Sequence, residues 1–231
     1  MPRVVSNISY CNRMSESQLV ARLEEFFQTT KVYSYKKRTL IFHPDDSLSS
    51  VFYVKSGYVR VFRITEEGEE LTLTILKPKD FFPLSYGIHT TTNPYHLEAI
   101  TPLELWKAPQ EQFIHYIKTN PEVFYDLTTN ILVSFDTVLL RMENLLFCNA
   151  SVKVAATLLM CAKGFGEDYH GNTRVKVPLT HRDIATLVGI TRETTSLEMK
   201  KLEKQGLLEK SGRFIIVKDL KRLESLSSYN L

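Results

Sequence analysis

The stretch that decides the fold is residues 180–206, which read THRDIATLVGITRETTSLEMKKLEKQG. It predicts two short helices separated by a tight turn. Thr180 is the expected N-cap of the first helix, because Asp183 follows three residues later and can bond back to the cap. Gly189 is expected to end this helix, since glycine readily adopts the positive φ needed just past a helix end. Thr191 is the expected N-cap of the second helix.

The two predicted helices differ in their surfaces. The first is amphipathic, with an apolar face formed by Ile184, Ala185, Leu187 and Val188. The second is expected to bury Leu197, Met199 and Leu202 and to expose polar side chains on its first turn. Such a pair is typical of a helix-turn-helix, whose second helix enters the major groove of DNA with its N-terminal residues on the base edges. An ordinary αα-hairpin with a solvated polar face is the alternative that this stretch leaves open.

The segment that follows favours the first interpretation. Residues 207–220, LLEKSGRFIIVKDL, contain two apolar-rich runs on either side of a Lys-Ser-Gly-Arg turn at 210–213. This pattern predicts a β-hairpin with a basic tip. A helix-turn-helix followed by such a hairpin is a winged helix.

These residues also resemble those of a known protein family. TRETTS at 191–196, with LEKQGLLEKSGRFIIVKDL at 202–220, resembles the DNA-binding domain of the cyclic-AMP receptor protein and fumarate–nitrate reduction regulator (CRP/FNR) family. The whole chain can be laid along that family. The resemblance implies a homodimeric, sequence-specific transcription regulator, which senses a small effector and repositions its helix-turn-helix on an inverted repeat in double-stranded DNA. It also implies RNA polymerase as a partner.

The side chains at the start of the second helix suit contact with DNA. Arginine donates bidentately to guanine and glutamate accepts from cytosine, whereas hydroxyl groups and a helix N-terminus can hold phosphates. We expect Arg192 to contact guanine and Glu193 to contact cytosine. The other predicted base or phosphate contacts are Thr191, Thr195, Ser196, Arg182, Lys210 and Arg213. Many family members have a further arginine where this chain has Leu197, which is expected to touch a thymine methyl group or to pack.

Charge is unevenly distributed along the 231 residues. Residues 151–231 hold 14 Lys and Arg against 9 Asp and Glu, a net +5, whereas residues 1–150 hold 15 against 17, a net −2. The basic part carries the predicted helix-turn-helix, as attraction to phosphates requires. Residues 1–14 lack the apolar core of a signal peptide, and no uninterrupted apolar run approaches the length of a bilayer span. We expect a cytoplasmic protein without a membrane partner.

Short β-strands are predicted between Lys31 and Pro109. The runs TLIF, SVFYVKSGYVRVFRIT, ELTLTIL, HLEAI and LELWKA are rich in β-branched and aromatic residues and are separated by turn signals. Many closely spaced strands favour a barrel or jelly roll. The resemblance narrows this to an antiparallel β-roll of the cyclic-nucleotide-binding type.

A long helix is predicted from Pro121 to about residue 149. Apolar residues recur on it at alternating steps of three and four, which is the spacing of a coiled-coil seam, and Ser134 and Arg141 interrupt this seam. The alternative is a helix that packs only on its own roll. In the family, this helix forms the dimer interface. The predicted dimer contacts are Phe124, Leu127, Ile131, Val138 and Leu145.

The expected fold is therefore α+β, with three parts. Residues 1–120 form the β-roll effector domain, residues 121–149 the dimerisation helix, and residues 150–231 the winged helix-turn-helix domain. In the family the roll holds the effector. The candidate pocket residues are mostly apolar: Phe81, Phe82, Leu84, Tyr86, Val138 and Leu139.

Cyclic AMP is disfavoured as the effector by three departures from the family pattern. Leu84 stands where the ribose-binding glutamate is expected, and Asn93-Pro94 lie near the position of the phosphate-binding Arg-Ser pair. On the long helix, Val138-Leu139 replace the hydroxyl pair that meets adenine. A cyclic phosphate needs a cation or a cluster of donors. We expect either a small, mostly apolar or aromatic effector or none.

No cofactor, metal site or catalytic site is predicted. Haem is disfavoured, because Pro83 and Ser85 stand where the haem-binding member of the family supplies a Cys or His ligand; a haem-binding sensor remains an alternative. The chain has only three cysteines, Cys11, Cys148 and Cys161, too few for the family's four-thiolate iron–sulfur cluster. The histidines lack the spacing of a cupin metal site, so an enzyme is not expected. A ligand- or partner-binding module that has kept the fold but not DNA binding is the alternative from another class.

Overall fold

The computed structural model describes residues 13–46, 49–83 and 93–227, with the backbone alone at residues 13–17. The chain divides into two compact units. The first comprises its described residues up to Val61 together with residues 75–137, and the second comprises residues 62–74 and 138–231, as far as they are described. The predicted division of the chain into three parts stays a prediction, because the boundaries of these two units fall at other residues.

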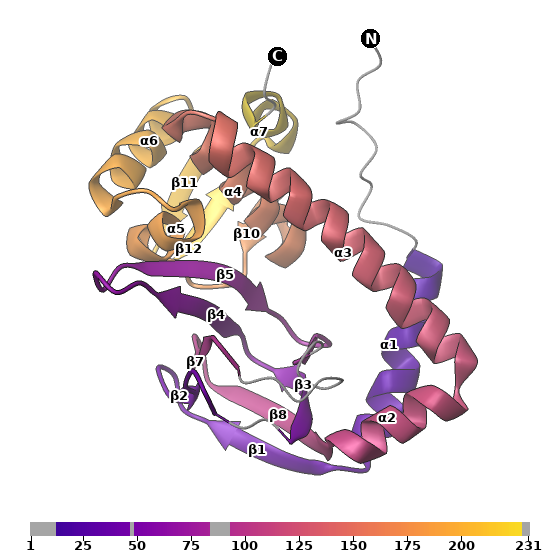
Figure 1. Ribbon diagram of the computed structural model, residues 1–231. Helices are drawn as coiled ribbons and strands as arrows, with labels where there is room; N and C mark the ends of the chain where they lie inside the picture. Colours follow the sequence, from indigo (N-terminus) through magenta and orange to yellow (C-terminus); the bar gives the residue numbers. More distant parts are fainter. Residues whose placement is uncertain (1–12, 47–48, 84–92, 228–231) are drawn as a thin grey trace. The chain divides into compact units, whose positions relative to one another are not determined.

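The first unit contains a β-roll of short antiparallel strands (Figure 1). One sheet has the order β1-β8-β3-β6, formed by β1 (Lys31–Tyr35), β8 (Leu103–Pro109), β3 (Ser50–Ser56) and β6 (Phe81–Phe82). The other sheet has the order β2-β7-β4-β5, formed by β2 (Leu40–Phe42), β7 (His96–Ala99), β4 (Val59–Ile64) and β5 (Glu70–Leu76). The second half of β4 (residues 62–64) and most of β5 (residues 70–74) belong to the second unit. The predicted α+β fold with an antiparallel roll is confirmed.

Strand β3 is buried on both faces, which explains why its sequence is almost continuously apolar. Phe52 and Val54 pack among the inward-facing side chains of the two sheets. Val51 and Tyr53 point to the opposite face, because side chains alternate along a strand, and pack against helices.

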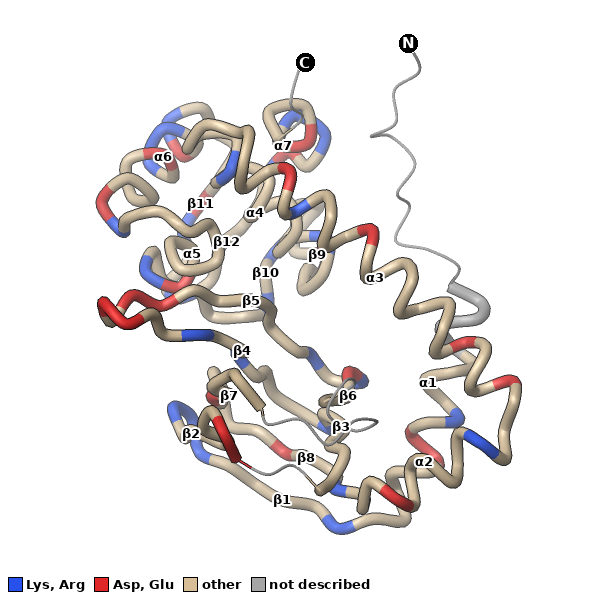
Figure 2. Tube along the Cα trace, in the orientation of Figure 1, with Lys and Arg blue, Asp and Glu red and all other residues tan. Residues whose placement is uncertain are grey.

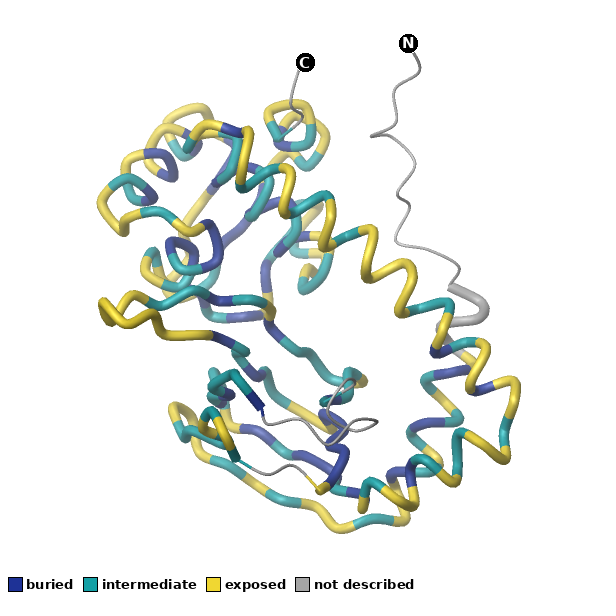
Figure 3. Tube along the Cα trace, in the orientation of Figure 1, coloured by how far each residue is buried: buried dark blue, intermediate teal, exposed yellow. Residues whose placement is uncertain are grey.

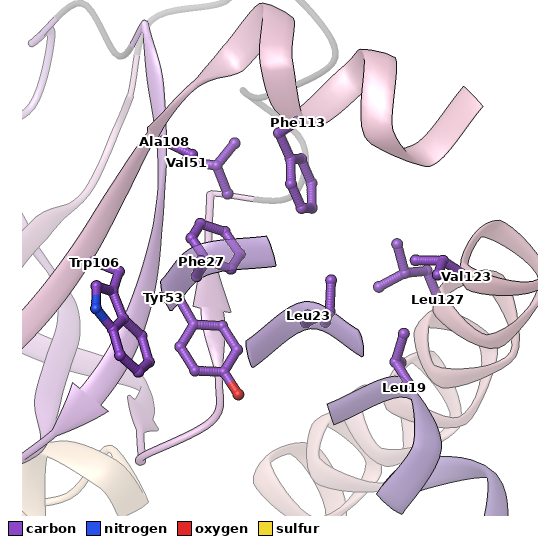
Figure 4. Packing of buried hydrophobic residues seen from close by; sticks show 10 residues of the cluster. All are labelled: Leu19, Leu23, Phe27, Val51, Tyr53, Trp106, Ala108, Phe113, Val123 and Leu127. Atoms are coloured by element: carbon purple, nitrogen blue, oxygen red, sulfur yellow. The ribbon is translucent and has the colours of Figure 1, made fainter. Parts of the chain in front are cut away.

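Those helices are α1 (Arg13–Gln28), α2 (Gln110–Thr119) and the first turns of α3 (Pro121–Phe147). Figure 4 shows their apolar side chains meeting the outer face of β3 and β8. The cluster consists of Leu19, Leu23, Phe27, Val51, Tyr53, Trp106, Ala108, Phe113, Val123 and Leu127. Leu127 is therefore a core residue of this unit, and its prediction as a dimer contact is wrong: it lies four residues, about one helical turn, after the buried Val123.

The rest of α3 is mostly exposed, as the yellow segments of Figure 3 show. Phe124 is 59% exposed, Ile131 44% and Val138 61%, whereas Leu145 is half-buried. Further exposed apolar residues of this helix are Tyr125, Leu132, Val133, Phe135, Leu139, Met142, Leu146 and Phe147. Such a surface is unusual for a helix that has no further partner.

The second unit contains the winged helix. Its elements are α4 (Ala150–Phe165), β9 (Gly166–Tyr169), β10 (Asn172–Val175), α5 (His181–Val188), α6 (Arg192–Lys204), β11 (Leu208–Ser211), β12 (Phe214–Val217) and α7 (Leu220–Ser227). The sheet order is β11-β12-β10-β9. Gly164 and Phe165 end α4, and the polar residues that follow form β9 and the turn into β10. Pairing with β10 converts this polar segment into an edge strand.

Arg141 of α3 holds α5 in this unit. Its guanidinium donates to the carbonyl oxygens of Leu73, Thr72 (2.8 Å) and Leu187 (2.9 Å). Burial lowers the pKa of Arg141 from its ordinary value. A side-chain bond between Thr72 and Thr186, with an oxygen–oxygen distance of 2.8 Å, lies beside it. Arg141 thus binds three carbonyl oxygens, two in β5 and one in α5, through one side chain.

Candidate nucleic-acid interface

The turn between α5 and α6 has the predicted capping geometry. Thr180 and Asp183 form a capping box, in which Thr180 N donates to Asp183 Oδ2 at 2.7 Å and Asp183 N donates to Thr180 Oγ1 at 3.2 Å. Gly189 ends α5 with a φ of 72°, a conformation that costs glycine little. Thr191 then caps α6, since its Oγ1 accepts from Thr194 N at 3.2 Å. These caps fix where the second helix begins.

The first turn of α6 presents Thr191, Arg192 and Glu193 as exposed side chains. Thr195 lies on the opposite side. It is fully buried, and its hydroxyl donates to Thr191 O at 3.0 Å. This placement removes Thr195 from the candidate DNA contacts.

Leu197 is 60% exposed, so its predicted burial is wrong. The buried face of α6 is formed by Thr195, Glu198, Met199 and Leu202, which recur at helical steps of three and four. Leu197 falls outside this repeat and joins the surface that carries Arg192 and Glu193. An exposed leucine at this position can make apolar contact with a thymine methyl group.

Ser196 is half-buried and faces α5. Its Oγ lies 2.8 Å from Nδ1 of His181, the first residue of α5. His181 Nε2 is buried and has no hydrogen-bond partner among the described residues. Sequence analysis missed His181, because nothing in a linear pattern pairs two residues 15 positions apart on different helices.

The surroundings of His181 are predominantly cationic. Its pKa is lowered from the ordinary value first by burial and then by the charge of Lys210; Arg192 and Lys200 also lower it, and Glu203 opposes them. These charges come from both α6 and β11. The helix-turn-helix and the hairpin therefore share one positive region, which suits a polyanion. Figure 2 shows the Lys and Arg positions of α6 in blue.

The hairpin β11–β12 matches the predicted wing. Ser211 pairs with Phe214 across its tip, and Gly212 at the tip has a φ of 58°. Lys210 and Arg213 are both exposed, and the Arg213 guanidinium carbon lies 5.2 Å from the centre of the Phe214 ring. This cation–π contact orients Arg213 without covering it.

Arg182 extends from the first turn of α5 and is 71% exposed. One of its nitrogens lies 3.4 Å from Glu70 Oε1 of β5. An ion pair this long and this exposed contributes little to stability. The guanidinium remains accessible, so its prediction as a phosphate contact stands as a prediction.

The predicted effector pocket stays a prediction, and four of its six residues lie among those that the structure describes. Phe81 packs against Phe113 with ring centres 5.8 Å apart, and Phe82 stacks on Phe52 at 5.4 Å, so both contribute to cores. Leu84 and Tyr86 lie outside the described residues. Val138 and Leu139 are exposed on α3 and belong to the second unit.

Asn93, near the expected phosphate-binding position, has a structural role. It is 2% exposed, and its Nδ2 donates to the carbonyl oxygens of His43 (3.1 Å) and Tyr95 (2.6 Å). Its Oδ1 accepts from Tyr95 N at 3.2 Å. The amide is thus occupied in holding two backbone segments together.

An open groove of about 810 Å³ lies between α1 and the α2–α3 junction. Two of its polar groups are engaged: Arg22 pairs with Glu122, and Tyr116 Oη donates to Arg22 O at 3.0 Å. Stacking of Phe26 on Tyr116, with ring centres 4.5 Å apart, forms one wall.

The described cysteines are buried and unsuited to reactivity. Burial raises the pKa of Cys161 to about 12 and also raises that of Cys148. Among the described residues, no group of three or more His, Cys, Asp and Glu side chains is arranged to hold a metal ion. Cys11 lies outside the described residues.

By length and composition, α3 is the one described helix that would suit a membrane span. Asp126, Asp136 and Arg141 interrupt its apolar surface, and a charged side chain at mid-bilayer costs about 2.5–3.5 kcal/mol. A helix that packs on a partner helix passes the same test.

Comparisons with known proteins agree with the β-roll and with the winged helix. Residues 32–120 match a cyclic nucleotide-binding domain, and residues 152–226 match a Crp-like helix-turn-helix domain. The cAMP-activated global transcriptional regulator CRP of Pasteurella multocida is 26% identical over 197 residues, which cover 84% of this chain and 93% of that protein.

Solved structures with the same fold include FixK2 from Bradyrhizobium japonicum. It has a TM-score of 0.76 and 23% identity, covering 88% of this chain and 100% of that one. A CRP/FNR-family transcriptional regulator from Thermus thermophilus has a TM-score of 0.68 and 26% identity, covering 85% and 98%.

Proposed function

Because this chain belongs to the CRP/FNR family of transcription regulators, we propose that it binds an inverted repeat in DNA as a homodimer, with one α6 in each half-site. It is an effector-sensing, DNA-binding transcription regulator, and its family is not one of enzymes. The observation that carries the proposal is the capped, exposed start of α6, where Arg192 and Glu193 stand beside a basic wing.

Within each half-site, Arg192 contacts a guanine and Glu193 accepts from a cytosine. Leu197 lies against a thymine methyl group. Arg182, Lys210 and Arg213 contact phosphates, and Thr191 adds a hydroxyl at the helix start. The exposure of all these side chains supports the assignment.

The homodimer forms through α3. Its exposed apolar surface, which includes Phe124, Ile131 and Val138, suits a second copy of the same helix packed along it. Two-fold symmetry then sets the two copies of α6 about one helical turn of DNA apart, roughly 34 Å, and makes the operator an inverted repeat.

The effector is a small, mostly apolar or aromatic molecule rather than cyclic AMP. In support, Asn93 is occupied by backbone contacts, and Val138 and Leu139 offer no hydroxyl to an adenine. Binding of this effector changes the position of the helix-turn-helix. As a regulator of transcription the dimer acts on RNA polymerase, in the cytoplasm.

The proposal is tested by selecting bound duplexes from a random pool with the purified protein, without added ligand. Recovery of an inverted repeat with G and C in each half-site is the expected result if DNA binding needs no effector. If nothing is recovered, the selection is repeated with a metabolite extract. Failure of both selections would contradict DNA binding and leave a ligand- or partner-binding module of the same fold.

A further inference from the structure

We propose that His181 is a positioning residue of the DNA-contacting surface: its Nδ1–H holds Ser196 Oγ, so that the Ser196 hydroxyl donates its own hydrogen to an acceptor atom of DNA. This inference rests on the proposed function, since it deepens the role of α6. It assigns to Ser196 a defined hydrogen-bonding direction and to His181 a part in recognition.

The geometry supplies the first argument. His181 opens α5, and Ser196 lies on the second turn of α6, with Nδ1 and Oγ 2.8 Å apart. Arg192, Ser196 and Lys200 follow one another at steps of four and so share one stripe of α6. Arg192 and Lys200 are exposed on that stripe, so the Ser196 hydroxyl lies between two cations on the same stripe.

The buried Nε2 supplies the second argument. It has no partner among the described residues, and an orphaned buried N–H is rarer than an orphaned acceptor. The single proton of the neutral ring is therefore assigned to Nδ1. Burial, Lys210, Arg192 and Lys200 lower the pKa of His181 against the opposing effect of Glu203, which keeps the ring neutral near pH 7.

Ser196 is thereby left as a donor. A serine hydroxyl has one hydrogen and can accept through its lone pairs. Because Oγ accepts from Nδ1–H, its hydrogen is available to guanine O6 or N7, thymine O4 or a phosphate oxygen. The hydroxyl of the preceding Thr195 differs, because its hydrogen is already donated to the backbone carbonyl oxygen of Thr191.

The test measures binding to the selected duplex by Ser196→Ala, His181→Phe and the double variant. Each single change should weaken binding about two- to tenfold, as expected for one neutral hydrogen bond. The double variant should be no weaker than Ser196→Ala, because both changes remove the same contact. His115→Phe, at an exposed histidine of α2, is the matched control and should bind like the parent.

Rescue separates positioning from simple packing. His181→Asn sets an amide N–H close to the place of Nδ1 and should recover most of the binding, whereas His181→Gln, which reaches toward Nε2, should not. Thermal unfolding of each variant verifies that it is folded. This Asn–Gln pair also keeps the test decisive if His181→Phe fails to fold.

The outcomes are distinct. If Ser196→Ala relaxes one base position, the acceptor is a base edge; if it weakens all duplexes alike, the acceptor is a phosphate, and both results support the inference. Parent-like binding by His181→Phe, or losses that multiply in the double variant, would overturn it while leaving the proposed function intact. Absence of DNA binding by the parent protein would instead remove the proposed function.

Discussion

At the scale of single residues, the proposed recognition of DNA depends on side chains that are exposed at the capped start of α6. Arg192 and Glu193 are exposed, whereas Thr195, two positions further on, is fully buried. A helix turns by about 100° per residue, so neighbouring positions of one polar run have opposite environments. The polar run from 191 to 196 is therefore a mixture of exposed and core residues.

Replacing Arg192 by alanine should reduce affinity for the selected duplex by about 1–3 kcal/mol and relax preference at one base pair of each half-site, because a bidentate contact to guanine is lost. Selection from a random pool and titration of matched and mismatched duplexes measure both effects. Arg222→Ala, at an exposed arginine of α7, is the control. Equal weakening on all duplexes would argue against a base contact.

Arg213→Ala should behave differently, since a residue at the wing tip contacts phosphates. Affinity should fall to a similar extent on every duplex, and the slope of log K against log salt should become shallower by about 0.9. Titrations at several salt concentrations give this slope. A change in base preference with an unchanged slope would move Arg213 from the phosphates to a base edge.

At the scale of elements, the placement of α5 depends on a contact far away in the sequence. Arg141 of α3 donates to carbonyl oxygens of Thr72 and Leu73 in β5 and of Leu187 in α5. Its position in the apolar pattern of α3 predicted an interruption of a coiled-coil seam. The structure instead gives it three backbone acceptors within the second unit.

Arg141→Met should destabilise the second unit by at least about 1–3 kcal/mol, because buried carbonyl oxygens lose their donor while the aliphatic volume is kept. Urea unfolding measures the change, and amide exchange in α5 should report faster opening there. Arg222→Met serves as the control for an exposed arginine. An unchanged free energy of unfolding would show that water replaces the guanidinium without cost.

At the scale of the whole molecule, the proposed dimer depends on the exposed apolar surface of α3. Val138 lies on it with 61% of its surface exposed. Each valine buried against a second copy contributes about 1.5–3 kcal/mol. A charge buried in the proposed interface loses its hydration, and two-fold symmetry places a second such charge in the same interface.

Val138→Asp should therefore raise the dissociation constant of the dimer by at least about tenfold, since about 1.4 kcal/mol corresponds to that factor. Sedimentation equilibrium measures it, with Glu143→Ala, at an exposed polar position of α3, as the control. Binding to an inverted repeat should weaken in parallel, whereas thermal stability of the monomer should change little. A dimer unaffected by Val138→Asp would place the interface on another surface.

The sequence by itself determined the order of the elements, a domain of short strands, the winged helix-turn-helix, and the capping residues Thr180, Gly189 and Thr191; the resemblance to the family narrowed the strands to a roll. These follow from local periodicity and from the backbone preferences of a few residue types, which neighbours along the chain set. Only the tertiary structure decided that Leu127 belongs to a core, that Leu197 is exposed, and that His181 meets Ser196. Each of these depends on which elements pack together, and packing joins residues that no linear pattern relates.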